Sequence, residues 1–278
     1  MKKFAMQFKA MWSCAFLFLM LPALSFAGGN NCAGATAVIP DGRSLELDYV
    51  APSSFAWYQF NATANHSYSV EVRDDLDPDN ADFTPTGGGN VLFYAPPVTC
   101  STPTSNTNYT DTHLIEPAAG PHATRFSFIP TTTGAYYISV QNGSSSVGHY
   151  VTMTVSETTI YSPTWNTNSN FTTQWILQNT TSQTISLTVT LTATTVSPPE
   201  IYTNGPLTLG PSSSSTSNQI LSTSGGFSPP LPTAGRVGYV MITHNGPPGA
   251  IQAYANEYNF GYPSPVLFQI PIGPMRGK

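Results

Sequence analysis

The acidic segment at residues 74–82 is the part of this chain with the clearest potential for chemistry. It places five of the 14 carboxylates of the sequence within nine residues. Anions at this density repel one another unless a cation or solvent relieves them, and Ca²⁺ takes six to eight oxygen ligands from carboxylates, carbonyls and amides. The segment therefore predicts a structural calcium site with four aspartates as ligands: Asp75, Asp77, Asp79 and Asp82.

Two other interpretations of these acids remain open. The segment lacks the glycine and the final glutamate of an EF-hand loop, so a solvated acidic loop is the simpler alternative to a calcium site. A hydrolytic pair is the second alternative, with Asp77 and Glu116 as the acids to test. No carboxylate partner sits in an apolar strand that would raise its pKa, and no serine lies in a G-x-S-x-G motif. We therefore expect a protein without catalytic activity.

The first 27 residues have the pattern of a secretory signal peptide. Three lysines precede an apolar run over residues 14–24, and Ser25 and Ala27 supply small side chains before the expected cleavage point. The run is shorter than the ~20 residues that a membrane-spanning helix requires. The sequence therefore predicts a cleaved signal peptide and a protein secreted to the periplasm or the cell exterior, without membrane insertion.

Cysteine usage agrees with export. Removal of the signal peptide leaves two cysteines, Cys32 and Cys100. In an oxidising compartment two cysteines form a disulfide by default. This bond would close a loop of 68 residues, which the chain-entropy account equates with about 4 kcal/mol of stabilisation. A catalytic thiol is the alternative, but it would leave the second cysteine unexplained.

The charge of the chain limits its partners. Charged residues make up 8% of the sequence, against about 25% in typical soluble proteins. After residue 27 only six lysines and arginines remain against 14 carboxylates, which gives a formal charge of −8. Because these cations are scattered, they form no basic stripe for nucleic acid. The chain therefore predicts partners that are polysaccharides or protein surfaces outside the cell.

Short alternating segments predict an all-β fold. They are separated by Gly, Asn and Pro turns, and no helical period competes with them. The pattern restarts near residue 158, where the charge content also falls, so we expect two β-sandwich domains of jelly-roll or immunoglobulin-like type at 28–157 and 158–278. The expected strands cover 44–50, 55–60, 67–73, 91–94, 124–128, 135–140, 150–155, 171–178, 184–192, 207–209, 235–243, 251–258 and 266–270.

Three segments of the first unit share a characteristic order of aromatic and branched residues. They are residues 57–60 (WYQF), 65–72 (NHSYSVEV) and 134–140 (GAYYISV). Through them the first unit resembles the bacterial pre-peptidase C-terminal domain, a small β-sandwich often attached to secreted proteases. Asn65 and His66 stand where that family usually has a glycine. The resemblance implies a non-catalytic accessory or binding role.

The second unit is similar to a domain of uncharacterised secreted bacterial proteins. Residues 161–165 (YSPTW), 175–179 (WILQN) and 243–251 (THNGPPGAI) carry this likeness, which implies no known activity. The unit is also rich in aromatic residues. Core packing is the favoured interpretation of these rings, and a sugar-stacking platform is the alternative, since flat rings suit the apolar faces of sugars. The residues are Trp165, Trp175, Tyr254, Tyr258 and Tyr262.

These observations favour a secreted, non-catalytic binding or adhesion module that calcium stabilises. Its partners would be extracellular polysaccharides or protein surfaces. A structural or self-assembling subunit is the main alternative, since an exposed edge strand can pair with a neighbour and residues 184–192 are free of charge. A hydrolase accessory or carbohydrate-active protein is the third hypothesis.

Overall fold

The computed structural model describes residues 29, 31–74, 90–96, 116–117, 123–142, 146, 148–168, 171–216, 226–232, 235–259, 261 and 266–274. These residues lie mostly in β-strands, which confirms the all-β prediction. In this part of the chain the single helical element is a 3₁₀ turn, η1 (Cys32–Gly34). None of its helices has the length and hydropathy needed to cross a bilayer.

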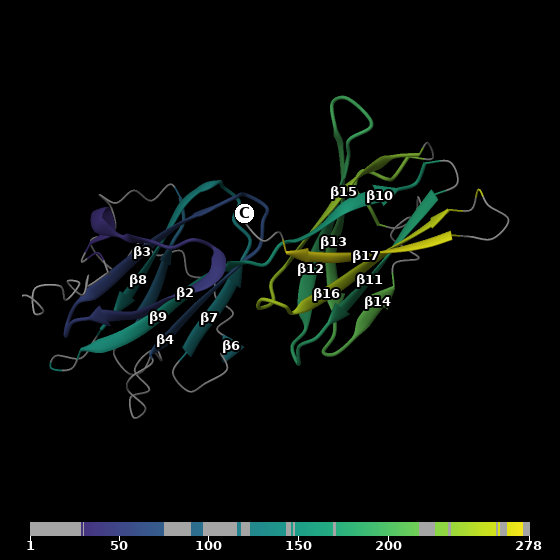
Figure 1. Cartoon of the computed structure of the whole chain (residues 1–278). Helices are drawn as coiled ribbons and strands as arrows, with labels where there is room; N and C mark the ends of the chain where they lie inside the picture. Colours follow the sequence, from purple (N-terminus) through teal and green to yellow (C-terminus); the bar gives the residue numbers. More distant parts are fainter. Residues whose placement is uncertain are drawn as a thin grey trace, which may run out of the picture.

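The first half of the chain forms two sheets around one core (Figure 1). One sheet has the order β1-β3-β8-β5 and the other β2-β9-β4-β7-β6. The alternation of each strand sends every second side chain between the sheets, so Tyr58, Ile138 and Met153 are fully buried. The strands are β1 (Thr36–Ala37), β2 (Asp41–Val50), β3 (Phe55–Ala62), β4 (Tyr68–Asp74), β5 (Asn90–Tyr94), β6 (Glu116–Pro117), β7 (Ala123–Phe128), β8 (Gly134–Gln141) and β9 (His149–Glu157).

The second half forms one eight-stranded sheet with the order β13-β12-β15-β10-β17-β16-β11-β14. Strand β10 joins the group β13-β12-β15 to the group β17-β16-β11-β14, because Ile160 and Tyr161 pair with both β15 and β17. Buried residues of the two groups form one cluster, so the sheet is folded back on itself. It therefore has two layers with a shared core. The strands are β10 (Ile160–Asn166), β11 (Phe171–Asn179), β12 (Ile185–Ala193), β13 (Glu200–Leu209), β14 (Ser214–Thr216), β15 (Val237–His244), β16 (Ile251–Asn259) and β17 (Val266–Pro274).

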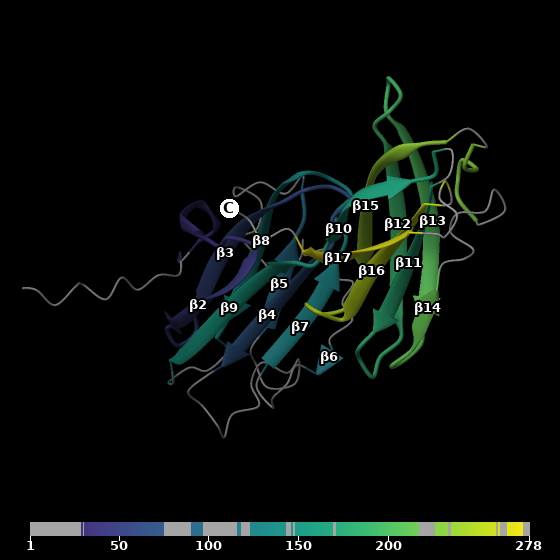
Figure 2. The same cartoon turned by 45° about the vertical axis from the view of Figure 1, so that its right-hand side comes forward.

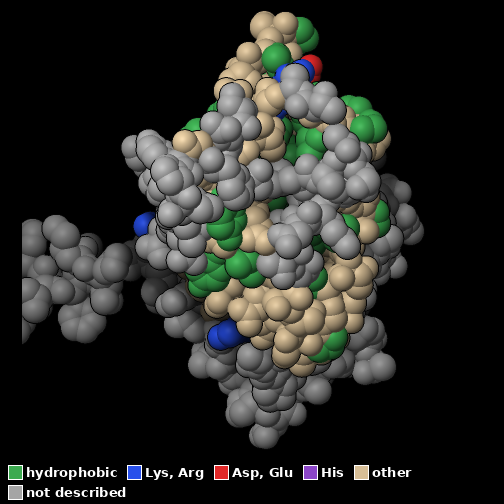
Figure 3. All heavy atoms as spheres, turned by 90° about the vertical axis from the view of Figure 1, so that its right-hand side faces the viewer, with side chains coloured by type: hydrophobic (Ala, Val, Ile, Leu, Met, Phe, Trp, Pro, Cys, Tyr) green, Lys and Arg blue, Asp and Glu red, His purple; other side chains and the backbone are tan. Residues whose placement is uncertain are grey.

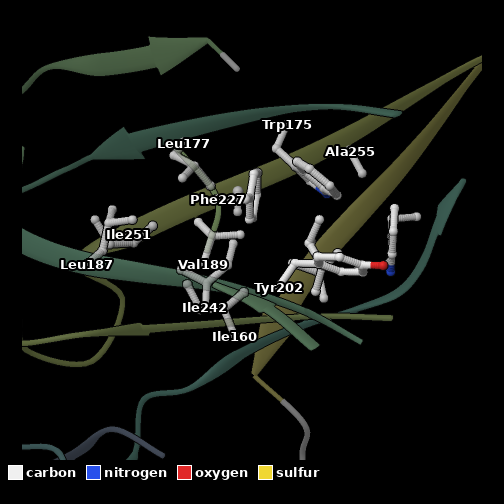
Figure 4. Packing of buried hydrophobic residues seen from close by; sticks show 14 of the residues in the cluster. Ile160, Trp175, Leu177, Leu187, Val189, Tyr202, Phe227, Ile242, Ile251 and Ala255 are labelled. Atoms are coloured by element: carbon white, nitrogen blue, oxygen red, sulfur yellow. The ribbon is translucent and has the colours of Figure 1, made fainter. Parts of the chain in front are cut away.

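The core between these two layers holds both tryptophans of the second half. Trp165 and Trp175 are 0% and 1% exposed, and the Trp165 indole N–H donates to the Thr192 carbonyl at 3.3 Å. Figure 4 shows Trp175, Leu177 and Phe227 pointing into this interior. Phe227 comes from the polar stretch after β14, so an irregular segment supplies part of the core.

Strand β12 lies between two neighbours and not at an edge of its sheet, which corrects the expectation that residues 184–192 could pair with another molecule. It pairs along its length with β13 on one side and with β15 on the other. Residues 184–192 therefore offer no exposed edge for pairing with a neighbouring molecule. Two edges that do exist are interrupted, because Thr203 of β13 forms a bridge with Ser228 and β2 carries two register shifts. Bulges and bridges of this kind protect sheet edges from aggregation.

The passage from the first half to the second is short and buried. Thr158 and Thr159 separate β9 from β10, and they are 5% and 1% exposed. The Thr158 backbone N–H donates to the Ser67 carbonyl at 2.8 Å, and the Ser67 N–H donates to Thr159 Oγ1 at 2.8 Å. Figure 1 shows the strands of the two halves as separate groups, and Figure 2 shows the first half on the left and the second half on the right of the turned view. Their assignment as two domains stays a prediction.

A polar cluster reinforces this crossing. His66 Nδ1 lies 2.8 Å from Glu157 Oε1, and the Tyr161 hydroxyl donates to the same oxygen at 2.9 Å. Burial and the nearby Glu157 charge raise the pKa of Tyr161, so its hydroxyl remains a donor. From the second half, His244 also contacts the crossing: burial lowers the pKa of His244 to about 4, and the neutral ring forms a hydrogen bond with the Thr158 backbone. Side chains from both halves thus fix the crossing.

Asp48 of β2 is a carboxylate inside the first core. The residue is 4% exposed, the Tyr58 hydroxyl donates to its Oδ2 at 2.6 Å, and Oδ1 has no hydrogen-bond partner among the described atoms. Burial raises the pKa of Asp48, and the opposing hydrogen bonds from Tyr58 and the Tyr49 backbone do not cancel this effect. The folded state therefore favours the protonated acid more than the unfolded chain does.

We expect Asp48→Asn to reduce the pH dependence of stability. A carboxyl with a raised folded pKa loses stability as pH rises from its unfolded value, about 3.9, through the folded value. The asparagine variant has no charge to bury and keeps an acceptor for Tyr58. Urea unfolding from about pH 4 to pH 8 should show that the free energy of unfolding of the variant increases relative to that of the wild type as pH rises. A difference that is constant with pH, or equal to that of the exposed Asp41→Asn control, would contradict this account.

Candidate functional site

The predicted calcium ligands Asp75, Asp77, Asp79 and Asp82 lie outside the described residues. The same holds for Cys100. Glu116 begins β6, but its side chain is not described, so the hydrolytic pair with Asp77 cannot be placed. Within the described ranges, no group of three or more His, Cys, Asp or Glu side chains is arranged to hold a metal ion. The acidic segment remains a predicted site.

Cys32 lies in a small apolar cluster on the outer side of the first sheet. It is 4% exposed and packs with Trp57 of β3 and with Leu92 and Tyr94 of β5. Residue 29 and η1 cover this face, since the Trp57 N–H donates to the Gly29 carbonyl at 3.0 Å. Trp57 is therefore part of an interior contact, whereas its neighbours Tyr58 and Phe60 belong to the main core.

The predicted aromatic platform divides into buried and exposed members. Trp165 and Trp175 are core residues, so they are unavailable for stacking on a ligand, and the core-packing interpretation is confirmed for both. Tyr254 is 38% exposed and Tyr258 is half-buried. Tyr262 lies outside the described residues. The register explains the division, because residues 175 and 254 belong to opposite phases of the paired strands β11 and β16.

The outward phase of β11 and β16 forms the candidate binding surface, which we call the amide–tyrosine face. Leu177, Ala253 and Ala255 point into the core, so their neighbours along each strand point outward. The two strands pair without a register shift over nine residues. The face consists of Gln174, Ile176 and Gln178 from β11 with Gln252, Tyr254 and Tyr258 from β16, and Asn256, which is 8% exposed, lies beneath it in the same phase.

Amide side chains lie on both sides of the exposed tyrosine. Gln178 is opposite Gln252, Ile176 is opposite Tyr254, and Gln174 is opposite Asn256. Opposite side chains are about 5 Å apart, and successive rows are about 7 Å apart along the strands. The Tyr258 hydroxyl donates to Gln174 Oε1 at 3.1 Å, which holds these two side chains together. The result is a flat strip with one exposed ring at its centre.

The strip carries no charge, and the described arginines elsewhere are already paired. Every arginine among the described residues contacts a carboxylate. The pairs are Arg43 with Asp41, Arg73 and Arg125 with Glu71, and Arg236 with Glu200. The Arg236 hydrogen bonds also hold the pKa of Glu200 below its usual value. Figure 3 shows the end of the molecule opposite the first half, where uncharged side chains make up most of the coloured surface.

Such a surface can bind neutral, hydroxyl-rich ligands. A primary amide offers two donors and one acceptor, which matches the alternating donors and acceptors of adjacent sugar hydroxyls. A tyrosine ring offers a flat apolar surface for the C–H faces of a sugar and a hydroxyl at its rim. A charged ligand would find no counterion on this strip. The alternation of Gln and Tyr in the sequence was the signal that could have separated the outward residues from the tryptophans.

Comparisons with known proteins found no match, either to a protein-family model or to a curated protein.

Proposed function

We propose that this chain is a secreted, non-catalytic module that binds neutral polysaccharides through the amide–tyrosine face. The observation that carries the proposal is the exposed Tyr254 with amide rows on each side. Pairing of the described arginines supports a neutral ligand over an acidic one. Strands β11 and β16 pair without a register shift over nine residues, and such a continuous surface suits an extended chain more than a compact small molecule.

Three further elements belong to this proposal. The first half would act as an accessory sandwich, in line with its resemblance to the pre-peptidase C-terminal domain. The aspartates of residues 74–82 would bind Ca²⁺ for stability. Secretion to the periplasm or the cell exterior follows from the predicted signal peptide. The hydrolase hypothesis is not favoured by any described side chain.

We expect Tyr254→Ala to weaken binding to a neutral polysaccharide by about tenfold, or 1.4 kcal/mol, because the ring supplies the central apolar contact. Affinity electrophoresis through gels containing galactomannan, mixed-linkage β-glucan or dextran would measure the change. Tyr150→Ala is the matched control, since Tyr150 has a nearly equal exposure of 37% and lies on β9 in the first half. Equal effects of the two substitutions, or binding to none of the three polymers, would contradict the proposal.

We also propose that Cys32 and Cys100 form a disulfide that fastens the segment before β1 to the chain after β5. Cys32 packs on Leu92 and Tyr94, and Cys100 follows β5 by six residues, a span of up to about 20 Å. Cys32→Ser and Cys100→Ser should each lower stability by about 4 kcal/mol. The double variant should cost no more than either single one. Thermal melts with and without reductant would test this, and an unchanged midpoint on reduction would contradict it.

A further inference from the structure

The other outer surface of the second half has a different chemistry, which the proposed site does not use. Leu187, Val189 and Leu191 of β12 point into the core, so the threonines between them face outward. The neighbouring strands β13 and β15 continue the same surface. We call it the threonine face, and it consists of Thr188, Thr190, Thr192, Ile201, Thr203, Tyr239 and Met241.

Two exposed apolar side chains stand in one row of the threonine face. Thr192 of β12 is opposite Ile201 of β13 and also opposite Tyr239 of β15. Ile201 is 57% exposed and Tyr239 is 43% exposed. They are therefore separated by two strand spacings, about 10 Å, and Thr192 between them is 8% exposed, so it forms the floor of the row. Single exposed apolar residues are ordinary, but two on one flat row make a defined contact surface.

The adjacent row adds hydroxyls and no charge. Thr190 is opposite Thr203 on one side and Met241 on the other. The charged residues beside this surface bind each other, since Arg236 Nε donates to Glu200 Oε2 at 2.7 Å and the Tyr202 hydroxyl donates to the same carboxylate. The threonine face thus combines a ring, a branched side chain and hydroxyls without any net charge. Both faces pair a ring with uncharged hydrogen-bonding groups, which are amides on the amide–tyrosine face and hydroxyls on the threonine face.

The two faces point in opposite directions. The layer that contains β12, β13 and β15 and the layer that contains β11 and β16 enclose the same core, so their outward sides are back to back. Packed sheets are about 10 Å apart, and side chains extend further on each side. An extended chain lying along one face is therefore out of reach of the other face. Two occupied faces would hold two different chains.

We propose, resting on the proposed function, that the threonine face is a second binding surface for neutral polysaccharide and that the protein cross-links polysaccharide chains. The exposure of Ile201, Tyr239 and Tyr254 supports simultaneous access, because all three side chains remain exposed with the first half present. Each face binds weakly, and the two together give avidity for a surface that presents many chains. A cross-linking protein needs no catalytic group.

The test compares cross-linking with binding for the full mature protein. Light scattering of dilute galactomannan, mixed-linkage β-glucan and dextran is measured as protein is added, and affinity electrophoresis is run on the same samples. Wild-type protein should raise the scattering to a maximum and then lower it, since excess protein leaves each molecule with one occupied face. The double variant Tyr239→Ala with Ile201→Ala should give no rise in scattering. Its migration should still be retarded in the polysaccharide gel, because the amide–tyrosine face is intact.

Tyr254→Ala should behave in the same way, because it leaves only the threonine face, whereas Tyr150→Ala should cross-link like the wild type. Thermal melts confirm that each variant is folded, and Tyr239→Phe, which keeps the ring, should keep cross-linking. Undiminished scattering in the Tyr239 and Ile201 double variant would overturn the second surface while the proposed function stands. Gel retardation of wild type without any rise in scattering would have the same meaning. Failure of wild type to bind any polymer would overturn both proposals.

Discussion

The strict alternation of side chains along paired strands is the constraint on which the rest of this structure depends. The chain has few charges, so burial of apolar residues must supply most of its stability. A shift of one residue in the register of β11 and β16 would expose Trp175 and Leu177 and bury the glutamines. The same register that closes the core therefore creates the outward strip of amides and tyrosine. Stability and the candidate surface have one origin.

Much of the fold could be predicted because its strands alternate clearly in sequence. The expected strand at 251–258 corresponds to β16, and that at 184–192 to β12, within one residue at each end. Strand β10 was missed because Pro163 interrupts its pattern; the structure places a register shift there, between Ser162 and Trp165. Proline lacks the N–H that a regular ladder needs, so it occurs at such irregularities.

The location of the site was harder to predict, because local patterns do not show which strands are neighbours. Composition drew attention to the tryptophans as well as the tyrosines, and only the pairing of β11 with β16 separates Trp175 from Tyr254. The central position of β12 depends on pairing with β15, about fifty residues away along the chain. Phe227 and Leu231 reach the core from a stretch that reads as a polar loop. Contacts of this range follow from tertiary packing and not from local periodicity.

The central claim is that the outward amides of β11 and β16 contact a neutral sugar chain, and side-chain amide NMR tests it most directly. The NH₂ signals of Gln174, Gln178 and Gln252 would be followed while a short galactomannan or β-glucan oligosaccharide is added. The account predicts shifts in these three groups, while Asn179, whose amide is buried and bonded to backbone carbonyls, stays unchanged. Shifts confined to the first half, or none at saturating sugar, would contradict the account.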